Sequence, residues 1–346
     1  MIKNYISLAL FMAASLPAVA GTVSQTNLVS DGATAASFTD PNLKNPWGIS
    51  FSPGGPFWVS DNATGLTTLY NTSGAIQGLV VAIPAAAGTG TGTPTGQVYN
   101  PSQDFKITQN GISGASAFIF ATEDGTISGW NFSVDSASAV IAVNRGAKGA
   151  VYKGIAFYTD SKGQNSLYVT DFHGGNIEVY NGSFKRTAAF HDTSLPANYS
   201  PYNVAVLNGN IFVTYAVVDK QRHDSISGKG KGILEEISPT GQVIARFEHG
   251  QLNAPWGLAL APAGWGKLSG DILVGNFGNG EIPVFTTALT PRGVLKTAGG
   301  TPLAIDGLWG LIPGNGGSGG AANAIYFSAG TNDEADGLFG AITYTP

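Results

Sequence analysis

The pentapeptide Trp47-Gly48-Ile49-Ser50-Phe51 indicates the fold, because its pattern of an aromatic residue, a glycine and alternating apolar residues recurs along the chain. Five further copies begin at Thr95, Lys153, Tyr202, Trp256 and Trp309. The six starts lie 48 to 58 residues apart. A period near 50 residues is typical of the blades of a β-propeller.

Each copy is followed by further strand patterns. Alternating β-branched and aromatic residues separated by Gly- and Asx-rich turns indicate strands, as in residues 167–170 and 175–180. The sixth unit shows only three strands, and residues 23–30 have the character of the missing fourth one. The sequence therefore predicts an all-β, six-bladed β-propeller of four-stranded blades, closed by the N-terminal strand in the last blade. Two stacked β-sandwich domains are the alternative, but a period that runs through residues 21–346 favours a single domain.

Composition excludes several classes of protein. The chain of 346 residues has 49 glycines, 11 % charged residues and a formal charge of −5. With no surplus of basic residues to neutralise phosphates, we expect no nucleic-acid partner. Since there is no cysteine, neither disulfides nor thiol chemistry can contribute.

The first twenty residues have the features of a secretory signal peptide. Lys3 precedes an apolar run of about 12 residues, and Ala18-Val19-Ala20 is a typical cleavage site. Such a run is too short to span a bilayer, and no longer apolar stretch follows. We therefore expect a periplasmic or extracellular protein without a transmembrane anchor, and a monomer.

Polar residues gather on one predicted face of the disc. The turns between the second and third strands of the blades open on the same face as the loops that enter the innermost strands. These turns hold nine of the 22 carboxylates of the chain: Asp61, Glu123, Asp124, Asp171, Asp219, Asp224, Asp333, Glu334 and Asp336. Loops on a rigid scaffold commonly carry function, although Asp and Asn also favour turns for local reasons.

Three histidines on this face are candidate metal ligands, namely His173, His191 and His223. Each stands beside or near a carboxylate, which can fix the tautomer of a ligating imidazole. Converging on the axis, they would bind Zn²⁺ with an open position for water, with Asp171 or Asp224 behind them. Solvated or turn-capping histidines are the alternative, because no short metal-binding motif is present.

Two other kinds of site fit residues of the same face. Oxygen ligands that recur at similar hairpin positions suit Ca²⁺; they are Asp61, Glu123, Asp171, Asn276 and Asn332. The wider set of candidate ligand-binding residues is Asp61, Glu123, Asp124, Asp171, Asp224, Asn276 and Asp333. Trp47, Trp256 and Trp309 form a candidate aromatic wall, for which core packing is favoured over stacking on a ligand.

The chain resembles an uncharacterised family of secreted bacterial propeller proteins, many of which carry a PEP-type C-terminal sorting tail. The resemblance covers nearly all of the mature chain and is carried by residues 45–48, 118–130, 168–173, 253–259, 306–309, 332–334 and 337–340. It implies the propeller fold and export but no established reaction. The sorting tail is not matched at residues 342–346, so release is favoured over anchoring. More distantly, the architecture resembles NHL-repeat propellers, some of which are metal-dependent lyases or lactonases.

From these observations we expect an exported binding propeller that takes a small molecule, a glycan or a protein on its polar face. The alternative is a metal-dependent hydrolase or lyase that uses the three histidines. A purely structural envelope or matrix protein is the third alternative.

Overall fold

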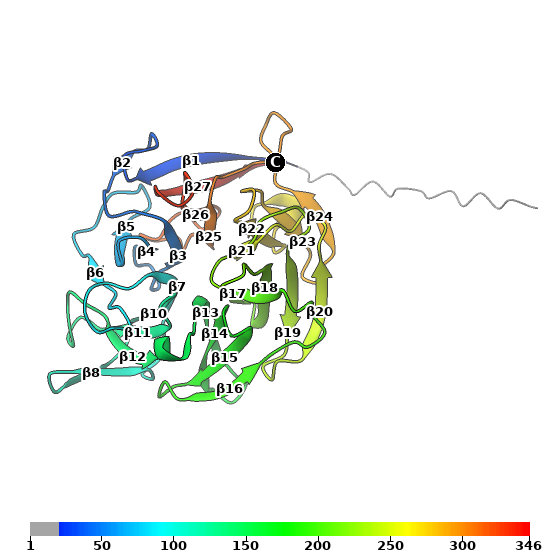
Figure 1. Cartoon of the computed structure of the whole chain (residues 1–346). Coiled ribbons are helices and arrows are strands. Elements are labelled where there is room, and N and C mark those ends of the chain that lie inside the picture. Colours follow the sequence, from blue (N-terminus) through cyan, green and yellow to red (C-terminus); the bar gives the residue numbers. More distant parts are fainter. Residues whose placement is uncertain (1–20) are drawn as a thin grey trace, which may run out of the picture.

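The computed structural model describes residues 21–346 and confirms the predicted fold. The chain is a β-propeller of six blades around a central axis (Figure 1). The predicted signal peptide, residues 1–20, lies outside the described residues. Within each of the first five blades the strands are antiparallel neighbours that follow one another in chain order from the axis to the rim.

The innermost strand of every blade contains one copy of the repeated phrase, as predicted. The first two blades consist of β3 (Pro46–Ser50), β4 (Phe57–Asp61), β5 (Leu66–Tyr70) and β6 (Val81–Ala82), and of β7 (Pro94–Tyr99), β10 (Phe118–Thr122), β11 (Thr126–Trp130) and β12 (Val140–Asn144). The next two consist of β13 (Tyr152–Thr159), β14 (Asn165–Asp171), β15 (Asn176–Asn181) and β16 (Arg186–Phe190), and of β17 (Tyr199–Leu207), β18 (Asn210–Val217), β19 (Ile233–Ile237) and β20 (Val243–Glu248). The fifth blade consists of β21 (Pro255–Leu260), β22 (Ile272–Asn276), β23 (Pro283–Phe285) and β24 (Pro291–Val294).

The sixth blade closes the ring by joining both ends of the described chain. It contains β25 (Leu308–Pro313), β26 (Ile325–Ala329) and β27 (Leu338–Thr345), and β1 (Thr22–Ser30) pairs antiparallel with β27 over eight registered positions. The predicted fourth strand is thus confirmed. A short parallel strand, β2 (Phe38–Thr39), adds to the outer edge. This closure covers an edge that would otherwise be open to other chains.

The described chain has few other elements. A hairpin of β8 (Lys106–Gln109) and β9 (Ile112–Ala115) projects from the second blade, between β7 and β10. The short 3₁₀ helices η1 (Gly146–Lys148) and η2 (Gly266–Leu268) lie in loops. Among residues 21–346, no helix has the length and apolarity needed to cross a membrane.

The hydrophobic core is divided between the blade interfaces and the axis. Six of the seven clusters of buried residues each join two neighbouring blades, and the seventh lies on the axis. Between the first two blades, for example, Trp58 stacks on Phe118 with ring centroids 4.0 Å apart. Each blade therefore buries its faces against both neighbours, as expected for a propeller in which no blade can bury its apolar faces alone.

The glycine of the repeated phrase is explained by the approach of the next innermost strand. At each of these glycines a Cβ atom would lie 2.2–2.8 Å from an atom of the next blade; they are Gly48, Gly96, Gly154, Gly257 and Gly310. The fourth blade has Asn203 instead, and its Nδ2 donates a hydrogen bond of 2.7 Å to the carbonyl oxygen of Trp256. Close backbone approach thus continues around the axis and makes the ring of innermost strands rigid.

Candidate functional site

The three tryptophans of the predicted aromatic wall pack against one another on the axis. Trp47 stacks on Trp309 with ring centroids 3.4 Å apart, and Trp256 meets both rings edge-on at 5.8 Å. All three are at most 4 % exposed. They therefore fill the channel. We call the axial group the aromatic plug; its members are Trp47, Tyr202, Trp256, Phe277 and Trp309.

A lysine lies against this plug on the side of the predicted polar face. Lys153, in β13, is 1 % exposed, and its ammonium lies 5.0 Å from the ring centroid of Trp47. The ammonium forms ion pairs with Glu123 and, at 3.5 Å, with Asp224. Buried ammonium groups require such partners. This residue was not among the predicted site residues, although Lys153 stands where three other copies of the repeat have tryptophan.

Amide side chains join the carboxylates around the lysine. Asn62 Nδ2 donates to Glu123 Oε2 at 2.8 Å, and Asn45 Nδ2 donates to Glu334 Oε1 at 3.1 Å. The indole N–H of Trp309 donates to Asn45 Oδ1 at 3.1 Å and so connects the network to the plug. We call this group of side chains from five blades the charged centre; it comprises Asn45, Asn62, Glu123, Lys153, Asp224 and Glu334.

Two carboxyl groups of the charged centre have shifted pKa values. Burial raises the pKa of Glu334, and the hydrogen bond from Asn45 opposes this rise without cancelling it. For Asp224 burial also acts to raise the pKa, but the charge of Lys153 and the hydrogen bond from His223 outweigh it and lower the pKa below its usual range. Convergent polar groups with shifted pKa values are characteristic of functional sites.

The three predicted histidines occupy separate exposed positions. His173 Nδ1 donates to the carbonyl oxygen of Gln221 at 3.2 Å, and His191 Nδ1 donates to that of Gly175 at 2.7 Å. His223 differs, because its Nδ1 contacts the carboxylate of the next residue at 3.0 Å. Two of the three histidines therefore make contacts typical of loop-stabilising side chains.

One group of three potential metal ligands occurs within residues 21–346. Ligand atoms of Glu123, His223 and Asp224 all lie within 4.8 Å of one another. This group contains one predicted histidine and two predicted carboxylates; His173 and His191 do not belong to it. It adjoins the ammonium of Lys153, so any cation bound there would face a positive charge already in place.

Most of the remaining predicted residues hydrogen-bond to backbone groups of nearby loops. Asp124 and Asp171 accept hydrogen bonds from backbone N–H groups, and the buried Asn276 bonds the backbone of the loop before β21. Asp61 is fully buried at the end of β4, and burial raises its pKa well above the usual range. Asp333 is exposed in a turn with a positive φ of 52°. None of these five belongs to the charged centre.

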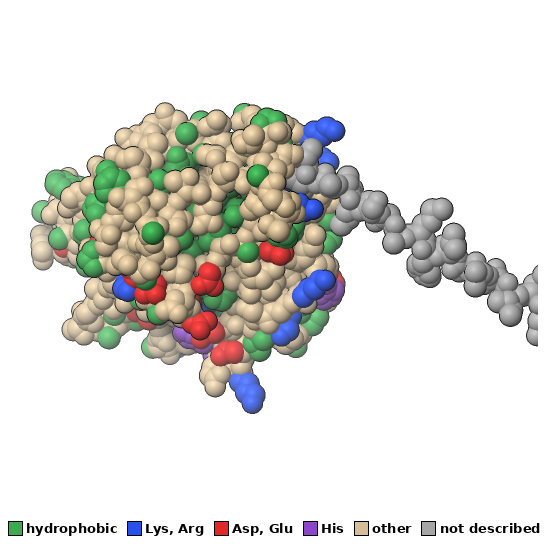
Figure 2. All heavy atoms as spheres, turned by 90° about the horizontal axis from the view of Figure 1, so that it is seen from above, with side chains coloured by type: hydrophobic (Ala, Val, Ile, Leu, Met, Phe, Trp, Pro, Cys, Tyr) green, Lys and Arg blue, Asp and Glu red, His purple; other side chains and the backbone are tan. Residues whose placement is uncertain are grey.

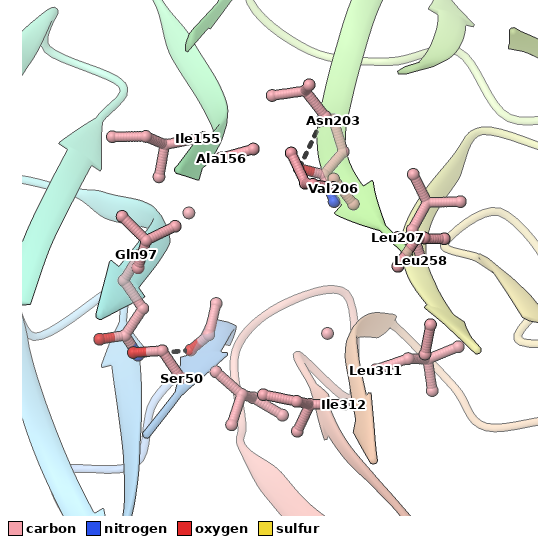
Figure 3. A pocket seen from close by; sticks show the side chains of 18 of the residues that line it. Ser50, Gln97, Ile155, Ala156, Asn203, Val206, Leu207, Leu258, Leu311 and Ile312 are labelled. Carbon is pink, nitrogen blue, oxygen red and sulfur yellow. Dashed lines mark hydrogen bonds between the residues drawn. The ribbon is translucent and has the colours of Figure 1, made fainter. Parts of the chain in front are cut away.

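Acidic side chains gather toward one side of the disc when it is seen edge-on (Figure 2). The opposite end of the axis has a different character. There a cavity of about 460 Å³ opens between the later residues of the innermost strands. Figure 3 shows apolar side chains on several sides of it, among them Ile155, Val206, Leu258 and Ile312. The ligand site predicted from the sequence lies on the polar face, and this cavity was not anticipated.

Comparison with known proteins gives relatives but no activity. No family model matches the chain. It is 31 % identical over 326 residues to the uncharacterized protein R648 of Acanthamoeba polyphaga mimivirus, covering 91 % of this chain and 78 % of that one. The uncharacterized protein L690 of the same virus is also 31 % identical, over 325 residues. The chain belongs to the family of these mimivirus proteins.

The resemblance predicted from the sequence was to secreted bacterial proteins. These two relatives are viral instead. As in the predicted bacterial family, their function is uncharacterised.

Solved structures agree with the fold alone. Virginiamycin B lyase from Staphylococcus aureus, in a catalytically inactive form with quinupristin, is 16 % identical with a TM-score of 0.53 over 93 % of this chain and 99 % of that one. The soluble aldose sugar dehydrogenase from Escherichia coli is 12 % identical with a TM-score of 0.54 over the same shares. At such identities a shared fold does not imply a shared function.

Proposed function

We propose that the protein is an exported binding propeller whose charged centre takes a small, uncharged, hydroxyl-rich ligand such as a sugar. The observation that carries the proposal is the convergence of three carboxylates, two amides and one buried lysine from five blades on the axis. Carboxylate and amide oxygens accept hydrogen bonds from hydroxyl groups, and those to charged acceptors are the stronger ones. The signal-peptide features of residues 1–20 support export.

The lysine supports an uncharged ligand over a metal ion. Lys153 is paired with Glu123 and Asp224, the carboxylates that a cation would need. Two like unit charges 4 Å apart repel by about 4 kcal/mol at an effective dielectric constant of 20, and a divalent ion doubles this cost. A neutral polyol avoids the repulsion and can hydrogen-bond the same oxygen atoms.

A second candidate is a metal-dependent hydrolase or lyase on the same face. The grouping of Glu123, His223 and Asp224 favours it, because one imidazole and two carboxylates suit Zn²⁺. A metal there would polarise a carbonyl group or activate water. This candidate requires the ammonium of Lys153 to move away from Asp224.

Calorimetric titration with a panel of neutral mono- and disaccharides tests the proposal, with Asp224→Asn as the variant. The side chain of Asp224 is 69 % exposed, so the variant should fold. Losing one charged acceptor is expected to weaken binding about tenfold or more. Glu236→Gln, in β19 of the same blade as Asp224, is the matched control and should bind like the wild type.

Metal analysis of the same preparations separates the two candidates. The absence of saccharide binding together with near-stoichiometric metal, lost in Asp224→Asn but kept in His173→Ala, would replace the proposal with the metalloenzyme. Loss of metal in His173→Ala would instead restore the three-histidine site predicted from the sequence. Absence of both saccharide binding and metal would remove both candidates.

A further inference from the structure

The second feature of the axis is the cavity at the end opposite to the charged centre. We call it the axial funnel. Its wall consists of residues from the innermost strands of all six blades and from the turn that follows β17, with Trp256 of the aromatic plug also contributing. None of the 25 lining residues is charged. The funnel thus contrasts with the other end of the same channel, where four charged groups meet.

Two amide side chains of the funnel wall are hydrogen-bonded to the backbone. Gln97 Nε2 donates hydrogen bonds to the carbonyl oxygens of Gly48 at 2.9 Å and Trp58 at 2.6 Å. Asn203 bonds Trp256 through Nδ2, and its Oδ1 accepts from the N–H of Val204 at 2.8 Å. These amides fix neighbouring blades to one another. Gln97 Oε1 and Ser50 Oγ are buried without a hydrogen-bond partner among the described residues, so the mostly apolar wall keeps two polar atoms that a ligand could bind.

The funnel is pre-formed because the strands around it cannot shift independently. Close approach at the repeated glycines and at Asn203 fixes the spacing of the innermost strands. A cavity that exists before binding avoids much of the ordering cost of association.

The size and shape of the funnel favour a small molecule over a protein partner. A cavity of about 150 Å³ lined by apolar residues binds benzene, so 460 Å³ accommodates a molecule about three times as large. This volume falls within the ordinary range of small-molecule sites. The exposed large apolar side chains of the described chain all lie elsewhere; they are Phe38, Ile76, Ile112, Phe132, Ile226 and Ile244. The apolar surface at this end is therefore concave, without the broad flat area that a protein interface needs.

We propose that the axial funnel is a second binding site, which takes a compact, uncharged and largely apolar small molecule. The proposal is independent of the function assigned to the charged centre. The driving force would be the removal from water of the apolar surface of both the ligand and the funnel wall.

Fluorescence titration of the purified protein with the neutral apolar dye N-phenyl-1-naphthylamine tests this site. We expect saturable binding of one dye per chain. Val206→Glu places a charge in the funnel wall at a partly exposed position, and the cost of burying it should weaken dye binding at least about tenfold. Ile312→Trp, from another blade, should weaken binding by filling space without adding charge.

Ile244→Glu is the matched control, because Ile244 is 61 % exposed in β20, the outer strand of the blade that contains Val206. It should bind the dye like the wild type. Failure of the wild type to bind dye at one site, or equal affinity in Val206→Glu and Ile244→Glu, would overturn the proposal. A wild-type oligomer that Val206→Glu converts to monomer, seen by light scattering, would overturn it in favour of a second copy of this chain as the occupant.

Discussion

The two ends of the axial channel lie at opposite ends of the same six innermost strands, yet one end is charged and the other apolar. At the charged end Lys153 is the first residue of one copy of the repeated phrase, and the other members of the charged centre come from loops between strands. The residues after the glycine are apolar or small in nearly every copy. A repeated architecture can therefore place different chemistry at its two ends, because the aromatic plug separates them. Substitutions in the aromatic plug, in the charged centre or at the glycines of the repeated phrase should therefore lower the stability of the protein to different extents.

Truncating Trp309 in the aromatic plug should cause the largest loss of stability. Trp309 is 1 % exposed and contacts four other aromatic rings. Trp309→Ala is expected to lower the free energy of unfolding by about 4 kcal/mol, the usual cost of a large buried aromatic truncation, measured by urea denaturation. Phe132→Ala, at a residue that is 66 % exposed, should cost far less. Similar losses in the two variants would show that the plug does not support the ring.

Removing the charge of Lys153 should destabilise the protein through the charged centre and leave ligand binding at the axial funnel unchanged. Lys153→Met leaves the largely buried carboxylate of Glu123 without its ammonium partner. Breaking such a buried pair should lower the free energy of unfolding by about 3 kcal/mol, measured by urea denaturation. Lys162→Met, at an exposed position in the same blade, is the control. Dye affinity at the axial funnel should stay within about twofold of the wild type. A tenfold change in that affinity would mean that the two ends are coupled.

Adding a methyl group at a glycine of the repeated phrase should cause a smaller loss of stability. In Gly310→Ala the new Cβ would lie 2.6 Å from the carbonyl oxygen of Trp47, so two blades must move apart at a cost of about 2 kcal/mol. Thermal unfolding measures this loss. Gly78→Ala is the control, because no atom beyond its chain neighbours lies within 4 Å of its Cβ position. Equal melting temperatures would argue against the close approach of the strands.

The smallest expected effect is on how the stability of the protein depends on pH through Glu334 of the charged centre. Burial raises the pKa of Glu334 in the folded protein. The stability linked to this group is therefore fully present below the unfolded pKa of about 4.3 and is lost as the pH rises through the folded pKa. Glu334→Gln keeps the acceptor for Asn45 and removes the charge. It should raise the melting temperature at pH 8 and leave it nearly unchanged at pH 4. A larger gain in melting temperature at pH 4 than at pH 8 would contradict a raised pKa of Glu334 in the folded protein.

The fold could be predicted in detail because a propeller repeats one strand pattern. The three strands of the last unit and the spare strand at residues 23–30 were enough to predict ring closure. The charged centre was predicted in part, since Glu123 and Asp224 were candidates while Lys153, Asn45 and Asn62 were not. Which loop side chains meet on the axis depends on distances between blades, which no spacing along the chain encodes. The axial funnel was missed because an apolar strand facing a cavity has the same sequence pattern as one facing a packed core.

The pairing of β1 with β27 also constrains when the molecule can be completed. The first strand leaves the ribosome roughly 15 to 60 s before its partner, at ordinary rates of about 5–20 residues per second. Throughout that interval β1 lacks β27 and can pair only with the short strand β2, although the strands of the first blade have already been made. The eight-residue strand β27 therefore locks the whole ring, and a chain released before β27 has been made would contain the other strands of the ring and yet remain open.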